Sequence, residues 1–99
     1  NQEDYKSLLT NRENITSFLK EIRLCFPKLY NKLHIEKATT ELELIKATYI
    51  CLFCLDVRTS DIALMMCVQN NSVSSRKKRL KEEIEYLDEF SNILTKEEN

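Results

Sequence analysis

The chain has 99 residues, of which 42% are hydrophobic and 31% are charged, and its net charge is −1. This size and composition are typical of a single globular domain and exclude an intrinsically disordered chain. The chain contains no glycine, which excludes the glycine-rich phosphate loops of Walker and dinucleotide-binding sites. Tight β-hairpins also depend on glycine, so the composition predicts an all-α fold in which short turns join the helices.

The first residues do not fit the pattern of a secretory signal segment. It opens at Asn1 rather than at methionine, and no basic stretch followed by an apolar one comes after it. The longest unbroken apolar run, Tyr49–Leu55, is seven residues long, whereas a membrane-spanning helix needs about 18 or more. We therefore expect a cytoplasmic piece of a longer protein, whose remaining part could carry a membrane tether.

Four cysteines raise the question of a metal or redox site. Cys51 and Cys54 form a CxxC pair, but they lie in an apolar helical stretch without the turn residues that zinc-binding pairs use. Cys25 and Cys67 stand alone in the sequence. We expect all four to be reduced cysteines that pack as small hydrophobic residues, and we expect no metal or cofactor.

The first part of the sequence predicts two helices separated by a proline. Thr10–Glu13 fits a capping box, in which threonine and glutamate each satisfy a free backbone amide at a helix start. Apolar residues then recur every three or four positions from Ile15 to Phe26. Pro27 interrupts this helix and can open a short one that ends near Leu33. The predicted inward residues of the short helix are Leu29, Tyr30 and Leu33.

A second capping box, Thr40–Glu43, predicts the start of a helix that runs to about Leu55. Apolar residues surround much of this segment, so we expect it to be the most buried element of the fold. Its predicted inward stripe consists of Leu42, Ile45, Tyr49, Leu52 and Phe53, widened by Ile50, Cys51 and Cys54.

Two short helices are predicted next, in the arrangement of a helix-turn-helix. Thr59 or Ser60 is the expected N-cap of the first, because hydroxyl side chains accept hydrogen bonds from the free amides at a helix start. The small side chain of Ala63 would let the second helix cross close to the first. Val68 is expected to fill the gap between the two helices, just before a polar turn at 69–72.

The second of these helices, predicted over 72–84, has a concentrated positive charge. Segment 1–61 has nine basic and nine acidic residues, whereas 62–81 has five basic residues and no acidic one. Val73 and Leu80 are expected to face the core, which would turn Ser74, Ser75 and Lys78 outward. An exposed basic helix favours binding to nucleic acid through phosphate and base-edge contacts, although a run of charges is also typical of a solvated helix surface.

The ordered set of motifs resembles the DNA-binding domain of the LuxR-type response regulators, which are bacterial transcription factors. The residues that carry the resemblance are Leu42, Asp61-Ile62-Ala63, Ser72-Val73, Arg79-Leu80-Lys81 and Ile84. The stretch from Phe18 to Leu33 also resembles the helical lead-in of a variant of this family. The resemblance implies the C-terminal output domain of a transcriptional regulator, which would place helix 72–84 in the major groove of double-stranded DNA. The expected DNA-binding residues are Thr59, Ser60, Asn71, Ser72, Ser74, Ser75, Lys77, Lys78, Arg79 and Lys81.

The resemblance also implies roles for individual residues among the expected DNA-binding residues. It further concerns where the last helix ends. Ser74, Ser75 and Lys78 would face the bases, while Lys77, Arg79 and Lys81 would lie near the DNA backbone. Glu85 stands where the family commonly has a helix-ending glycine. We therefore expect the last helix to run on toward Leu94 or to break near Asp88.

The predicted organisation is a helical lead-in at 1–39, the helix-turn-helix at 40–84 and a helical extension at 85–99, all in one compact unit. The extension is rich in apolar residues, namely Tyr86, Leu87, Phe90, Ile93 and Leu94. These residues would either pack onto the first helix or pair with a second copy of the chain, since the family pairs through its terminal helix. A homodimer through this helix stays open.

Two other functions stay open from the sequence. The basic patch and the apolar tail would also suit a helical module that binds an acidic protein partner, and a promoter-reading domain of a σ factor uses the same helix-turn-helix. An enzyme is not expected, because His34 is the only histidine and no nucleophile and orienting acid can be placed beside it. We also expect no small-molecule ligand.

Overall fold

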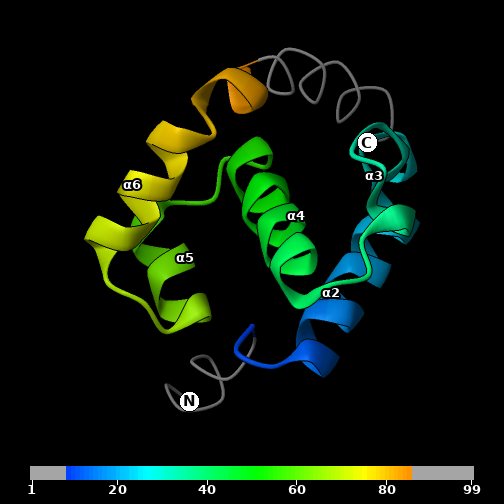
Figure 1. Cartoon of the computed structure of the whole chain (residues 1–99), viewed down its shortest axis with the longest axis horizontal. Coiled ribbons are helices and arrows are strands. Elements are labelled where there is room, and N and C mark those ends of the chain that lie inside the picture. The colour runs from blue at the N-terminus through cyan, green and yellow to red at the C-terminus, as the bar shows by residue number, and fades with distance from the viewer. Residues whose placement is uncertain (1–8, 86–99) are drawn as a thin grey trace.

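The computed structural model describes residues 9–85, and every regular element among them is a helix (Figure 1). In chain order these elements are α2 (Arg12–Cys25), α3 (Pro27–Lys32), the short 3₁₀ helix η1 (Ile35–Lys37), α4 (Glu41–Cys54), α5 (Thr59–Met66) and α6 (Asn70–Arg79). A further helical stretch follows at 81–85. The all-α prediction is therefore confirmed. No helix in this part of the chain combines the length and the apolar character needed to cross a membrane.

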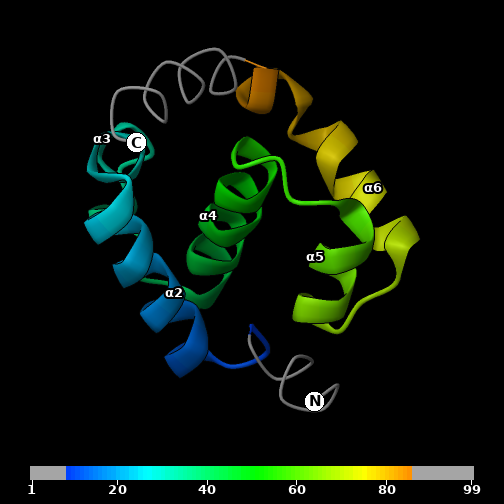
Figure 2. The same cartoon turned by 180° about the vertical axis from the view of Figure 1, so that it is seen from behind.

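Helix α4 lies at the centre of the fold, with α2 and α3 on one side and α5 and α6 on the other (Figures 1 and 2). Eight of its 14 residues are buried, more than in any other described helix, as predicted. They are Leu44, Thr48, Tyr49, Ile50, Cys51, Leu52, Phe53 and Cys54. The prediction for Leu42 is wrong, because this residue lies in the first turn, before the part of α4 that its neighbours cover, and is 80% exposed. Leu44 instead is buried and belongs to the same core cluster as Ile15 and Leu19 of α2.

Side-chain caps stabilise the starts of α2 and α4. At α4 the predicted capping box is present: Thr40 Oγ1 accepts the Glu43 amide at 3.2 Å, and Glu43 Oε1 accepts the Thr40 amide at 3.0 Å. Hydrogen bonds from Thr40 favour the ionised carboxylate and lower the pKa of Glu43. At α2 the prediction is wrong by one residue. Asn11 rather than Thr10 is the cap, because Asn11 Oδ1 reaches the Asn14 amide at 2.8 Å.

The lead-in helices are tied to the rest of the fold by backbone and side-chain contacts. Pro27 starts α3 as predicted, and Leu29 of α3 is buried. Arg12 donates from Nη2 to the Thr39 carbonyl at 2.9 Å, which joins the start of α2 to the turn before α4. These contacts hold α2 and α3 against the side of α4 that faces away from α6 (Figure 1).

Helix α5 has Arg58 as its N-cap, not Thr59 or Ser60 as predicted. The helix starts earlier because the Arg58 carbonyl already accepts the amides of Asp61 and Ile62, both at 3.0 Å. The Arg58 side chain also pairs with Asp61, with 3.0 Å between Nε and Oδ2. The buried face of α5 consists of Ile62 and Ala63.

The turn between α5 and α6 depends on a left-handed residue, Cys67, with φ of 54° and ψ of 47°. The Cys67 amide donates to the Leu64 carbonyl at 3.3 Å and the Val68 amide to the Ala63 carbonyl at 3.0 Å, a pair of bonds that closes many helix ends. The prediction that Val68 fills the gap between the helices is wrong. Its side chain is 39% exposed and lies at the rim of the hollow between α5 and α6, where Ser60 and Asn70 also lie.

Cys67→Gly is expected to raise the free energy of unfolding by about 1 kcal/mol, because a Cβ atom crowds the backbone in the left-handed conformation. Cys67→Val is expected to lower it, since a β-branched side chain crowds the same backbone further. Urea denaturation of the two variants and the wild type measures the difference. A lower midpoint for the glycine variant than for the valine variant would contradict this account of the turn.

Helix α6 starts at Asn70, two residues before the predicted start at Ser72. The reason lies in Gln69, whose carbonyl accepts the amides of Ser72 at 3.0 Å and Val73 at 3.3 Å. Gln69 is therefore the N-cap, although its side chain makes no capping hydrogen bond. The extra residues lengthen the polar start of the basic helix.

Helix α6 ends at Arg79, and the backbone turns at Leu80 before the helical stretch 81–85. The prediction of one continuous helix through residue 84 is wrong. The turn allows Ile84, which is 3% exposed, to join the core while Leu80 packs against the same core, and these contacts decide where the helix breaks. The predictions for Asp88, for Leu94 and for the apolar tail lie outside the described residues.

The cysteines divide into a buried pair and an exposed pair. Cys51 and Cys54 are 0% and 6% exposed in α4, as expected for small hydrophobic residues. Cys25 and Cys67 are exposed instead, which corrects the prediction that they pack inside. None of the four forms a disulfide, and residues 9–85 contain no group of three side chains that could hold a metal ion.

Burial raises the pKa of the Cys51 thiol from the ordinary value of 9.0 to about 12. A group whose pKa is raised by folding stabilises the native state fully below its unfolded pKa, and this stabilisation is lost as the pH rises. We therefore expect the free energy of unfolding to fall between pH 9 and pH 12, and to fall less steeply in Cys51→Ala. Urea denaturation across this pH range measures how the free energy of unfolding changes with pH in the wild type and in Cys51→Ala. Equal slopes for the two proteins would contradict the prediction.

Candidate nucleic-acid interface

Helix α6 has one side toward the core and the opposite side toward solvent. Val73 is 0% exposed and anchors the inner side. Asn71, Ser75 and Lys78 are exposed on the outer side, because residues at i, i+4 and i+7 share one face of a helix. We call these three residues the outer ridge of α6.

One side of the outer ridge carries two arginines, Arg76 and Arg79, which we call the arginine flank. The guanidinium carbon of Arg76 lies 4.3 Å from the ring centroid of Tyr49 in α4, close enough for a cation–π interaction. Arg79 is exposed. The two arginines line a hollow together with Tyr49, Val68, Asn71, Ser72 and Ser75.

The other side of the outer ridge carries two lysines, Lys77 and Lys81, which we call the lysine flank. Lys77 Nζ lies 5.8 Å from the ring centroid of Phe53 in α4. Lys81 lies just after α6 and pairs with Glu85, with 3.6 Å between Nζ and Oε1. A second hollow on this side is lined by Ser74, Lys77, Lys78, Lys81, Ile84 and Glu85.

Two neighbouring aromatic rings of α4 support both flanks. Tyr49 and Phe53 are buried, and their ring centroids are 6.0 Å apart. The guanidinium group of Arg76 lies over the Tyr49 ring and the ammonium group of Lys77 lies over the Phe53 ring, so two of the five cations contact the aromatic side chains of α4. Burial raises the pKa of the Tyr49 hydroxyl, and the charge of Arg76 partly offsets this.

The sequence analysis missed this packing role of Arg76 and Lys77. The signal that could have found it is their spacing of three and four residues from the inward Val73, which places both beside the core-facing side of the helix. Lys77 is exposed as a residue, and its ammonium nitrogen lies over the Phe53 ring.

The predicted DNA-binding residues are nearly all accessible. Nine of the ten are exposed, and the exception is Thr59, which is half-buried at the start of α5. Ser60 lines a shallow hollow between α5 and α6 with Asn70 and Asn71. The fold therefore brings Ser60 next to the start of the basic helix, but it does not bring Thr59 there.

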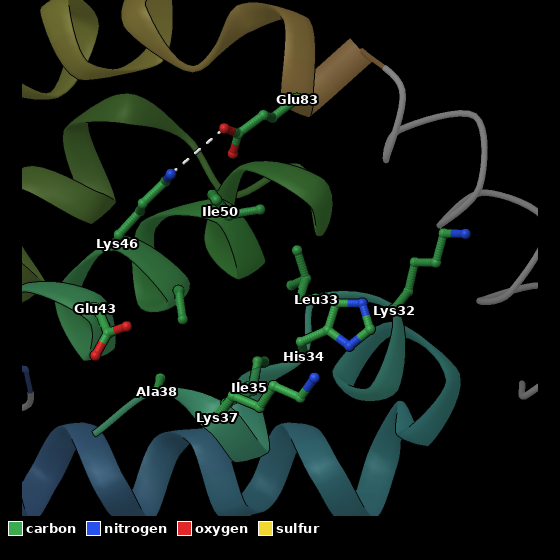
Figure 3. Close-up of a pocket in the computed structure, with 11 residues that line it drawn as sticks. Lys32, Leu33, His34, Ile35, Lys37, Ala38, Glu43, Lys46, Ile50 and Glu83 are labelled. Atoms are coloured by element: carbon green, nitrogen blue, oxygen red, sulfur yellow. Dashed lines mark hydrogen bonds and ion pairs between the residues drawn. The ribbon is translucent and has the colours of Figure 1, made fainter. Parts of the chain in front are cut away.

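A further cleft lies between η1, α4 and the stretch 81–85 (Figure 3). It has a volume of about 490 Å³, and it is lined by Lys32, Leu33, His34, Ile35, Lys37, Ala38, Glu43, Lys46, Ala47, Ile50 and Glu83. Lys46 Nζ lies 3.4 Å from Glu83 Oε1, which links α4 to the stretch after α6. Glu83 is thus paired with α4.

No family model matches this chain, and no curated protein or solved structure is significantly similar to it. The function is therefore inferred from the site itself. The distinguishing feature of the site is an exposed basic helix, seated on aromatic rings, in a segment without an acidic residue from Ile62 to Lys81.

Proposed function

We propose that this chain binds double-stranded DNA by placing α6 in the major groove. The observation that supports the proposal most strongly is the exposed cationic surface of α6 within segment 62–81, which has five basic residues and no acidic one. The major groove of DNA is wide enough to accept one α-helix. Helix α6 lies at the outer edge of the fold, where a groove could approach it (Figure 2).

Short polar side chains on the outer ridge suit close contact with base edges. Asn71 and Ser75 can donate and accept hydrogen bonds there, and Lys78 can donate to an acceptor on a base. At the start of α6, the Gln69 side chain makes no capping hydrogen bond. The backbone amides of a helix start attract phosphate, so this end of α6 adds a contact to the DNA backbone.

The resemblance to LuxR-type response regulators supports a more specific proposal. In this proposal the chain is the C-terminal output domain of a bacterial transcriptional regulator. Two copies would read two half-sites if they paired through the C-terminal segment. That segment, 86–99, lies outside the described residues, so the homodimer stays a prediction.

Fluorescence anisotropy of a labelled mixed-sequence duplex tests the proposal. The duplex is titrated with the chain at salt concentrations between about 50 mM and about 200 mM. If the two arginines and two lysines of the flanks contact phosphates while Lys78 meets a base, the logarithm of the binding constant should fall against the logarithm of salt with a slope of about −3.6. A folded sample that binds the duplex at no salt concentration would contradict the proposal and would favour an acidic protein partner for the basic helix.

A further inference from the structure

The cations of α6 are sorted by residue type around the helix. Arg76 and Arg79 line the hollow on one side of the outer ridge. Lys77 and Lys81 line the hollow on the other side. Residues three or four positions apart lie on the same side of a helix, so Arg76 and Arg79 form a short row along α6. Lys81 follows the turn at Leu80, and it is grouped with Lys77 because both line the same hollow.

Each flank combines an inner cation held on an aromatic ring with an outer cation that is exposed. Arg76 lies over Tyr49 and Lys77 over Phe53. Arg79 and Lys81 are exposed, and Lys81 pairs with Glu85. A side chain that is already held in place loses less conformational entropy when it binds a ligand. Each row is therefore partly preorganised to bind an anion.

The geometry of the major groove gives these two rows different partners. The groove is about 12 Å wide, close to the diameter of about 10–12 Å of an α-helix with its side chains. A helix in the groove has one phosphate backbone on each side, so cations on opposite sides of the helix meet opposite strands.

We propose that the arginine flank binds the phosphates of one DNA strand and that the lysine flank binds those of the other strand. This inference rests on the proposed DNA binding and adds which residues meet which backbone. Arginine can bind a phosphate through two parallel hydrogen bonds, whereas lysine acts as a point charge. The arginine flank therefore sets the register of α6 on the duplex, and the lysine flank adds attraction without the same geometric demand.

Ethylation interference tests the strand assignment. The probe is a duplex that the whole chain selects from a random-sequence library, with each strand end-labelled in turn. Arg79→Ala is expected to remove the interference on one strand, and Lys81→Ala is expected to remove it on the other. Each variant should also lower the salt slope by about one, and Arg79→Lys and Lys81→Arg should restore the contact with the same strand. Lys20→Ala, an exposed position on α2, should leave both patterns intact.

The outcomes separate the inference from the proposed function. If both alanine variants lose interference on the same strand, or if each variant lowers the interference on both strands equally, the assignment of flanks to strands is overturned while DNA binding stands. If the wild-type chain selects and binds no duplex, the DNA-binding proposal is overturned, and the strand assignment with it. Circular dichroism of each variant confirms that it is folded.

Discussion

The double substitution of Arg79→Glu and Lys81→Glu is expected to lower the affinity for duplex DNA at least about a hundredfold at low salt. Each residue would lose a charge-assisted contact with a phosphate, worth about 1.5–3 kcal/mol. Each new carboxylate would also repel the DNA backbone. Both side chains are exposed, so the core of the fold stays intact. The same anisotropy titration measures the loss.

The matched control is Lys20→Glu together with Arg23→Glu. It also turns two positive charges into two negative ones, but on exposed positions of α2, on the other side of α4 from α6 (Figure 1). Salt screens charges that are more than about 10 Å from the DNA, so we expect this pair to change the affinity only a few-fold. Equal losses in the two double variants would mean that net charge, and not α6, is responsible for binding.

Ile62→Ala is expected to lower the free energy of unfolding by about 2–5 kcal/mol, because truncating a fully buried isoleucine leaves a cavity. Ile62 is 0% exposed and belongs to the same core as Leu52 of α4 and Val73 of α6. For a domain of this size the loss corresponds to a fall in Tm of about 10 °C or more. Thermal unfolding followed by circular dichroism measures it.

Leu64→Ala is the control for this substitution, since Leu64 lies on the same helix but is 45% exposed. We expect it to change stability by less than about 1 kcal/mol, because a surface substitution leaves little or no cavity. If both variants lost the same small amount, Ile62 would not be the contact that seats α5 and α6 on α4.

Several elements follow from interactions within a few residues, and the sequence predicts these well. The capping box at Thr40 needs only Glu43, three positions later, to form its two hydrogen bonds. Pro27 starts α3 because its ring suits the first turn of a helix. The inward position of Val73 follows from the spacing of apolar residues along a polar helix.

Other features depend on elements that are distant in the sequence, and sequence reasoning missed them. Leu42 fits the apolar stripe of α4 but is exposed, because burial requires a neighbouring helix beside that turn of α4. Arg76 and Lys77 look like surface cations until α4 places Tyr49 and Phe53 beside them. Both errors arise because periodicity gives the direction of a side chain but not which residues of other helices lie in that direction.

The sequence by itself determined the helical class, the central place of the apolar helix and the concentration of charge on the basic helix, because composition, caps and periodicity are local properties. The tertiary structure alone decided that α6 ends at Arg79, before a turn at Leu80, and that the cations of segment 76–81 divide into two flanks. The break depends on Ile84 reaching the core, and the flanks depend on which rings of α4 lie beneath the helix. Such contacts exist only once the helices have packed together.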